Sequence, residues 1–394
     1  MFTEIENISG AVQIIFNEKG KRILVKPGEK IGVPKISYYK IAELLGTHFF
    51  KPVRKINNNN TVIIFLAISP VCKKVFDVVK KSPLLKDVDL FPITVHELRK
   101  PSPTVVNFLI QLKPKLLITL NESAKSMRYF IKKVREYLPK TKILLLEHGI
   151  IDHSSLRKVL DPDTNYKSFQ PILSDYVASF SEFTRKKILK LNPTFPKKRI
   201  RVTGYPILDK YKNKTLSKRQ REKNKTILFV SSPRVWFNNE REKDIWATRN
   251  IMQIIPDAFP DYNLVVRFKD YRDAEPFIRR VKFKGKATLS NEEPIEQALA
   301  KSTVVLSIYS TVCCEAGFMR IPVAKIDYNR IKENPNLYWN VFNRHQLVPV
   351  TKKMLKATNQ DLGKQYEIVT KLAKMGNNSK DFIKFIKDIL DDNV

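Results

Sequence analysis

Two short stretches of the sequence place polar side chains where a buried strand is expected to end. The first is KILLLEHG at 142–149, an apolar run that ends in Glu147 and His148. The unperturbed pKa of an imidazole lies near neutrality, so His148 is a candidate general base. The alternative is that His148 only hydrogen-bonds a neighbouring loop.

Glu147 is expected to have a different task from its neighbour. Successive strand residues point to opposite faces, so Glu147 and His148 cannot both face a ligand directly. We therefore predict that Glu147 orients the site. Asp152, in the polar turn that follows, is the third candidate catalytic residue.

The second stretch is SIYSTVCCEAGFMRIPV at 307–323, whose pattern predicts a strand end, a turn of small residues and a short helix. Ser310 and Thr311 would present hydroxyl and backbone NH groups at the positive end of that helix, where a phosphate binds. Glu315, one turn along, would accept hydrogen bonds from ribose hydroxyls, and Gly317 would permit close helix packing. Alternatively, Ser310 and Thr311 simply cap the helix.

Further candidates for phosphate binding follow two other predicted strands. TILFVSSPR ends in two hydroxyls and a guanidinium, and NLVVRFK ends in two cations. Arginine can bind two phosphate oxygens at once, which favours a nucleotide-binding role. An ordinary Ser-Pro turn is the alternative for the first group. These candidates are Ser231, Ser232, Arg234, Arg267 and Lys269.

Short apolar runs alternate with amphipathic helical stretches from Thr61 onward, and a second series of the same kind begins at Arg199. This alternation predicts parallel strands joined by helical crossovers. The basic segment 210–225 between the series is predicted to be a solvated linker or loop. It lacks aromatic residues beyond Tyr211 for base stacking. Two α/β domains in series predict a ligand cleft between the carboxyl edges of two sheets.

The composition of the whole chain narrows the class of protein. A net charge of +33, from 72 Lys and Arg against 39 Asp and Glu, favours anionic partners, or reflects lysine placed on solvated faces. A hydrophobic content of 43% argues against global disorder. The three cysteines lack metal-ligand spacing and predict a reducing, cytoplasmic location. Because no apolar run approaches the roughly 18 residues of a membrane span, any membrane contact is expected to be peripheral.

Three motifs together resemble those of GT-B-fold glycosyltransferases. They are EHG at Glu147–Gly149, RVTGYPILD at Arg201–Asp209 and YSTVCCEAGFMRIPV at Tyr309–Val323. The resemblance is to the broad group that includes teichoic-acid and capsule polymerases of the CDP-glycerol glycerophosphotransferase type, polysialyltransferases and UDP-N-acetylglucosamine 2-epimerase. It covers roughly 61–327. Where the teichoic-acid enzymes usually carry a His-Pro pair, Arg267 or Lys269 would supply the charge.

The resemblance implies an α/β fold with two Rossmann-like domains facing across a cleft, and it implies a metal-independent transferase without a cofactor. The substrates would be a nucleotide-sugar donor and a glycan or lipid-linked acceptor, with His148 as the base. The alternatives are a nucleotide-sugar 2-epimerase and a non-enzymatic protein that binds nucleic acid or another polyanion.

The predicted domains follow from the two α/β series and the resemblance. The predicted divisions are an amino-terminal β extension with a hairpin (1–60), an acceptor-side Rossmann-like domain (61–198), a nucleotide-donor-binding Rossmann-like domain (199–376) and a carboxyl-terminal helix that packs on either domain (377–394).

Overall fold

The structure is a computed structural model of the 394-residue chain. It describes residues 2–7, 13–16, 22–25, 30–34, 50–52, 61–66, 70–93, 109, 113–120, 122, 125–149, 170–231, 241–268, 287–290, 293–308, 310–330 and 335–394.

The amino-terminal part forms small antiparallel sheets. The predicted hairpin is confirmed, because β2 (Gln13–Phe16) pairs antiparallel with β3 (Arg22–Val25). The other strands of this part form a sheet in the order β4-β1-β5, and they are β1 (Phe2–Asn7), β4 (Lys30–Pro34) and β5 (Phe50–Pro52).

The first sheet has six parallel strands in the order β11-β10-β9-β8-β6-β7. Its strands are β6 (Thr61–Leu66), β7 (Val88–Ile93), β8 (Leu116–Thr119), β9 (Lys142–Leu146), β10 (Tyr176–Ser179) and β11 (Ile200–Val202). The helices around it are α2 (Pro70–Lys80), η1 (Pro83–Leu85), α4 (Lys125–Tyr137), α5 (Glu182–Leu191) and η3 (Lys197–Arg199).

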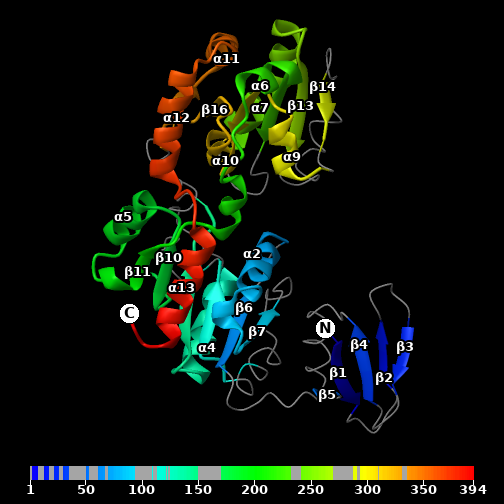
Figure 1. Ribbon diagram of the computed structural model, residues 1–394, viewed down its shortest axis with the longest axis vertical. Coiled ribbons are helices and arrows are strands. Elements are labelled where there is room, and N and C mark those ends of the chain that lie inside the picture. The colour runs from blue at the N-terminus through cyan, green and yellow to red at the C-terminus, as the bar shows by residue number, and fades with distance from the viewer. Residues whose placement is uncertain are drawn as a thin grey trace.

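The second sheet also has six parallel strands, in the order β14-β13-β12-β15-β16-β17. Its strands are β12 (Thr226–Ser231), β13 (Asn263–Phe268), β14 (Ala287–Leu289), β15 (Val304–Ile308), β16 (Val323–Ile326) and β17 (Trp339–Val341). The helices around it are α7 (Arg241–Ala258), α9 (Ile295–Ala300), α10 (Val312–Phe318), η5 (Arg344–Gln346), α11 (Leu347–Leu355) and α12 (Asn359–Leu372). Figure 1 shows the two α/β domains with their helices around the sheets, as predicted.

The central strands of both sheets are buried on two faces, which is why β6, β8, β9 and β12 are nearly continuous apolar runs rather than alternating ones. Leu144 of β9 lies in the cluster that includes residues of α2 and of α13 (Asn378–Leu390), whereas Leu145 packs with Ile188 of α5. The prediction for Gly317 of α10 is confirmed. A methyl group there would lie 2.6 Å from Cγ2 of Val369 in α12, so only glycine allows these helices to approach so closely.

The chain crosses between the domains twice. The first crossing holds η4 (Pro206–Tyr211) and α6 (Lys218–Asn224), so the basic segment predicted to be a loop contains a helix. In the second crossing, the chain leaves α12 and returns to the first domain as α13 (Asn378–Leu390), where Arg201 pairs with Asp388 (Figure 1). The predicted boundary between the two Rossmann-like domains at residue 199 lies too early in the chain. The strand β11 pairs with β10 and completes the first sheet, so Ile200–Val202 belong to the first domain.

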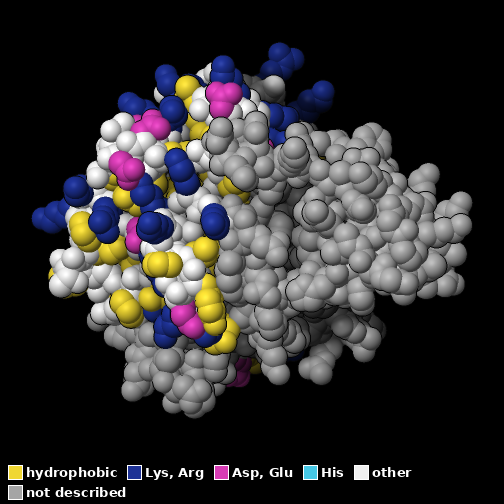
Figure 2. All heavy atoms as spheres, turned by 90° about the horizontal axis from the view of Figure 1, so that it is seen from below, with side chains coloured by type: hydrophobic (Ala, Val, Ile, Leu, Met, Phe, Trp, Pro, Cys, Tyr) yellow, Lys and Arg dark blue, Asp and Glu magenta, His cyan; other side chains and the backbone are white. Residues whose placement is uncertain are grey.

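The charges on the surface are mixed. Figure 2 shows Lys and Arg side chains spread among Asp, Glu and hydrophobic side chains on the described part of one face. None of the helices in the described ranges is long and apolar enough to cross a membrane.

Candidate functional site

His148 lies at the carboxyl edge of the first sheet, directly after β9. The strand β9 pairs with a parallel strand on each side, β8 and β10, which carries the chain to this edge. The Nδ1 atom of His148 donates a hydrogen bond to the carbonyl oxygen of Leu120, which follows β8, over 2.8 Å. In the neutral ring this assignment makes Nε2 the acceptor nitrogen. The side chain is exposed, so the ring is anchored on one side and reachable from solvent.

Glu147 points into the first domain. Only 3% of the residue is exposed, and its Oε2 atom accepts hydrogen bonds from the backbone NH of Phe180 at 3.1 Å and the hydroxyl of Ser179 at 3.2 Å. Its Oε1 atom has no hydrogen-bond partner among the described residues. Burial raises the pKa of Glu147 to about 7, against the opposing effect of these hydrogen bonds. The carboxyl group therefore braces the end of β9 against the end of β10.

Ser310 and Thr311 lie at the carboxyl edge of the second sheet, where β15 turns into α10. The hydroxyl of Ser310 accepts a hydrogen bond from the backbone NH of Val312 at 3.4 Å, in agreement with the capping alternative. Thr311 occupies the N-cap position but makes no side-chain capping hydrogen bond. Both residues are partly exposed.

Glu315 lies one turn along α10, as predicted, and it has an unpredicted partner. The hydroxyl of Tyr211, in η4, donates a hydrogen bond to its Oε2 atom. Burial raises the pKa of Glu315, while the Tyr211 hydrogen bond and the charge of Lys210 oppose the rise. The carboxyl group is therefore held by the segment that connects the two domains.

The two carboxyl edges meet at a glycine. A methyl group added at Gly149, the residue after His148, would lie 3.3 Å from Cγ2 of Thr311. Such a distance is tighter than ordinary van der Waals contact. Two motifs more than 150 residues apart in the sequence are thus side by side in the structure.

Arg267 and Ser231 point to opposite faces of the second sheet. Arg267 is in register with Val230, whose side chain lies on the α9 and α10 side. Its Nη1 atom is buried without a hydrogen-bond partner among the described residues. Burial lowers the pKa of the guanidinium, against the effect of Glu293 and Glu296. The guanidinium of Arg267 therefore lies at the carboxyl edge of the second sheet, and its Nη1 atom can donate a hydrogen bond to an anion.

Ser231 is fully buried, and its hydroxyl shares a hydrogen bond of 3.1 Å with the hydroxyl of Thr248 in α7. This side chain is thus occupied on the face away from Arg267. The remaining predicted site residues lie outside the described residues, and they are Asp152, Ser232, Arg234 and Lys269.

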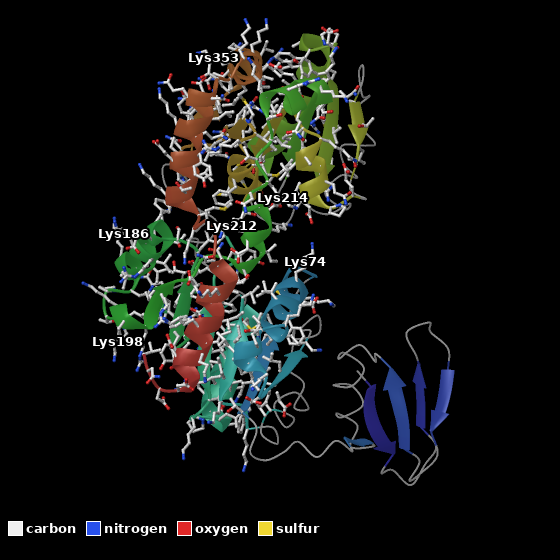
Figure 3. The ribbon with its side chains drawn as sticks, viewed as in Figure 1. Lys74, Lys186, Lys198, Lys212, Lys214 and Lys353 are labelled. Atoms are coloured by element: carbon white, nitrogen blue, oxygen red, sulfur yellow. The ribbon has the colours of Figure 1, made fainter. Side chains whose placement is uncertain are left out.

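We call the place where Gly149 of the first domain approaches Thr311 of the second the junction. Several polar residues near this junction were not predicted. The ammonium group of Lys210 in η4 forms an ion pair of 3.0 Å with Glu296 at the start of α9. Lys74 of α2 acts electrostatically on both Glu296 and Glu315. Figure 3 shows Lys74 at the end of α2 that faces the second domain. Lys210 and Tyr211 stand four and five residues after Pro206 of the Gly-Tyr-Pro turn, and that proximity was the available signal in the sequence.

Two other features are separate from this junction. A surface hollow is lined by residues of α7 and η5, none of which is a candidate residue, and they are Gln253, Ile254, Asp257, Ala258 and Arg344. Within the described ranges, no group of three or more His, Cys, Asp or Glu side chains is placed to hold a metal ion.

The comparisons with known proteins concern the fold. No protein-family model matches the sequence, and no curated protein matches it significantly. Solved structures do match over most of the chain. The S. aureus MnaA-UDP co-structure is 12% identical with a TM-score of 0.57, over 85% of this chain and 98% of the other.

Two further structures give the same picture. A variant of the wall teichoic acid polymerase TagF is 13% identical with a TM-score of 0.56, over 85% of this chain and 90% of the other. The Methanocaldococcus jannaschii UDP-GlcNAc 2-epimerase, in complex with UDP-GlcNAc and UDP, is 12% identical with a TM-score of 0.56, over 83% of this chain and 99% of the other. At this identity the likeness concerns the fold. The chain has the GT-B fold of two Rossmann-like domains, as predicted.

The Gly149 contact gives a direct test of the junction. Changing Gly149 to valine would force Thr311 away from the end of β9, because the space for even one methyl group is tight. We expect turnover to fall by about tenfold to a hundredfold, since small displacements of reacting groups have effects of that size. Steady-state kinetics and nucleotide affinity should be measured together, and the affinity is expected to fall as well, because Thr311 is a candidate phosphate contact.

Gly363 provides the matched control for this change. A methyl group there would have the tip of Arg320, at 4.0 Å, as its nearest neighbour. Gly363→Ala should therefore keep full turnover. Wild-type turnover in Gly149→Val would mean that the close approach of the two edges has no part in the reaction.

Proposed function

We propose that this protein is an enzyme that uses a nucleotide-activated sugar, and that it transfers the sugar or a related group to a glycan or lipid-linked acceptor. The observation that carries the proposal is the close approach of Gly149 to Thr311, where an added methyl group would lie 3.3 Å from Cγ2 of Thr311, because it brings a histidine from one sheet beside the hydroxyl-rich turn and carboxylate of the other. The GT-B fold supports the proposal, since structures with which it is shared were solved with UDP or UDP-GlcNAc.

The second domain is assigned to the donor. Arg267 supplies a partly exposed guanidinium with a buried Nη1 atom for the phosphate oxygens, and the hydroxyls of Ser310 and Thr311 contact the same group. Glu315 accepts a hydrogen bond from the ribose. Ser232, Arg234 and Lys269 remain proposed donor contacts on the basis of the sequence alone, and Ser231 is proposed to support the strand end from behind.

The first domain is assigned to the acceptor. The Nε2 atom of His148 takes the proton of the acceptor hydroxyl while the new bond to the acceptor oxygen forms. The bond to the diphosphate oxygen breaks, and the nucleoside diphosphate leaves with the electron pair. The positive charge of Arg267 stabilises the charge that develops there, so the proposal assigns no cofactor or metal. Glu147 and Asp152 are proposed to orient the histidine loop.

A nucleotide-sugar 2-epimerase is the second candidate, and the likeness to UDP-GlcNAc 2-epimerases favours it. An epimerase would form product from the nucleotide sugar without an acceptor. The proposal places the reaction in the cytoplasm, with peripheral contact to an anionic membrane as the route to a lipid-linked acceptor.

Thermal-shift measurements with nucleotides, nucleotide sugars and oligonucleotides test this function, because a ligand that binds the native state raises the Tm. We expect UDP, CDP or their sugars to raise it. Stabilisation by oligonucleotides alone would favour a nucleic-acid-binding protein and contradict the proposal.

Changing Arg267 to alanine is expected to weaken nucleotide binding by about 10- to 100-fold, because it removes charge-assisted hydrogen bonds to phosphate. Calorimetric titration measures this change. Arg249→Ala is the control, since that guanidinium lies 5.7 Å from the ring centre of Trp246 on α7. Equal affinities of the wild type and Arg267→Ala would remove Arg267 from the donor site.

A further inference from the structure

Three consecutive side chains of η4 bind three different helices. The carboxylate of Asp209 accepts hydrogen bonds from the backbone NH groups of Asn378 and Ser379 at 2.9 and 2.7 Å, which caps α13. Lys210 pairs with Glu296 of α9, and Tyr211 donates its hydroxyl to Glu315 of α10. The segment that joins the domains is therefore attached to one helix that packs on the first domain and to two helices of the second.

The Tyr211 hydroxyl is a well-placed donor for Glu315. The side chain of Tyr211 is fully buried, and burial together with the nearby Glu315 raises its pKa, so the hydroxyl keeps its proton. It binds Oε2 alone. Among the described residues, no second hydrogen-bond donor to the Glu315 carboxylate is recorded, and the residue remains partly exposed. One carboxylate oxygen is thus held from inside the protein while the other has capacity for a ligand.

We propose that Tyr211 is a positioning residue for the donor nucleotide, which holds Oε2 of Glu315 so that Oε1 is presented to a ribose hydroxyl. This inference rests on the proposed function. It specifies the donor as a ribonucleotide, because a carboxylate held in a fixed position distinguishes ribonucleotides from analogues that lack the ribose hydroxyls. When a bound nucleotide covers Oε1, an acceptor left without its donor is costly, so the analogue without hydroxyls binds more weakly.

The comparison of UDP and CDP with their 2′,3′-dideoxy analogues tests the inference. The wild type is expected to bind the ribonucleotide about tenfold or more tightly than the dideoxy analogue. In Tyr211→Phe the preference should fall to about twofold or less, while the affinity for the dideoxy analogue stays unchanged. A purely structural role would instead weaken both ligands equally.

Tyr205 supplies the matched control. It precedes η4, is buried with 6% exposure, and its pKa is raised by burial and in part by the charge of the same Glu315. Its hydroxyl has no hydrogen-bond partner among the described residues. Tyr205→Phe should therefore keep the wild-type preference for ribonucleotides. Glu315→Ala is the second variant, and it should lose the preference even if Tyr211→Phe is poorly folded, because no acceptor for the ribose hydroxyls remains at this position.

The pH dependence of the preference gives an independent measurement. Besides Tyr211, the charged groups that act on Glu315 are Lys210 of η4, Glu296 of α9 and Lys74 of α2. The Tyr211 hydrogen bond lowers the pKa of Glu315 against the rise that burial causes, so its loss raises that pKa further. The preference of the wild type should disappear as the pH falls through the pKa of Glu315, and the small residual preference of Tyr211→Phe should disappear at a higher pH.

The outcomes separate the two proposals. A wild type that binds no nucleotide overturns the proposed function and this inference with it. A wild type that binds the ribonucleotide and the dideoxy analogue equally overturns the inference alone. The same holds if Tyr211→Phe retains the wild-type preference and pH profile, or if it weakens both ligands to the same extent.

Discussion

Changing His148 to alanine is expected to lower turnover by about 10²- to 10⁴-fold, the range typical for loss of a general base. The affinity for the nucleotide should stay the same, because the proposed donor contacts belong to the second domain. The Nδ1 hydrogen bond to Leu120 fixes the ring and leaves Nε2 as the acceptor nitrogen. Release of nucleoside diphosphate under saturating donor and acceptor measures the effect on kcat.

His345 provides the control for this experiment. It is an exposed histidine of η5 and is not among the candidate residues. His345→Ala should have wild-type kcat. A His148→Ala variant that binds nucleotide less well, with turnover otherwise intact, would place His148 in the donor site and contradict its assignment as the base.

The fold could be predicted because its strongest signals are local. The strand β9 is an uninterrupted apolar run, and the same holds for β6, β12 and β15, so burial on both faces is visible in the sequence. Alternation with amphipathic helices then fixes parallel pairing. β7 was missed because VDLFPI carries an aspartate and a proline at the edge of the sheet.

The error at 199 has a related cause. β11 has three residues and belongs to the first sheet only because it pairs with β10. A strand of that length carries no information on which sheet it joins. In the sequence, β11 also follows a helix and a turn. A strand at that spacing could be the last strand of the first domain or the first strand of the second.

The candidate site was predicted in part, since the sequence marks strand ends but not their partners. His148, Ser310 and Thr311 follow buried strands, and parallel sheets bring such positions to one edge. The bond between Tyr211 and Glu315 joins residues 104 positions apart. It depends on the path of the chain between the domains, which no periodicity specifies. The burial of Ser231 against Thr248 likewise depends on which face the last strand residue occupies.

Glu147 also links the site to the pH dependence of stability. Its pKa in the folded protein is raised from 4.5 to about 7, mainly by burial. A raised pKa means that the folded state favours the protonated form. The contribution of Glu147 to the free energy of unfolding is therefore fully present below pH 4.5 and is lost as the pH rises through about 7. A shift of this size corresponds to about 3 kcal/mol.

Changing Glu147 to glutamine should remove this pH dependence, because the amide cannot ionise while its oxygen can still accept hydrogen bonds from Phe180 and Ser179. The free energy of unfolding of the variant, relative to the wild type, is expected to increase by about 3 kcal/mol between pH 4.5 and pH 8. Urea unfolding at several pH values measures it, with the exposed Glu182 changed to glutamine as the control. Parallel pH profiles for Glu147→Gln and the wild type would contradict the raised pKa. They would show that the Glu147 side chain accepts its hydrogen bonds from Phe180 and Ser179 as an ionised carboxylate.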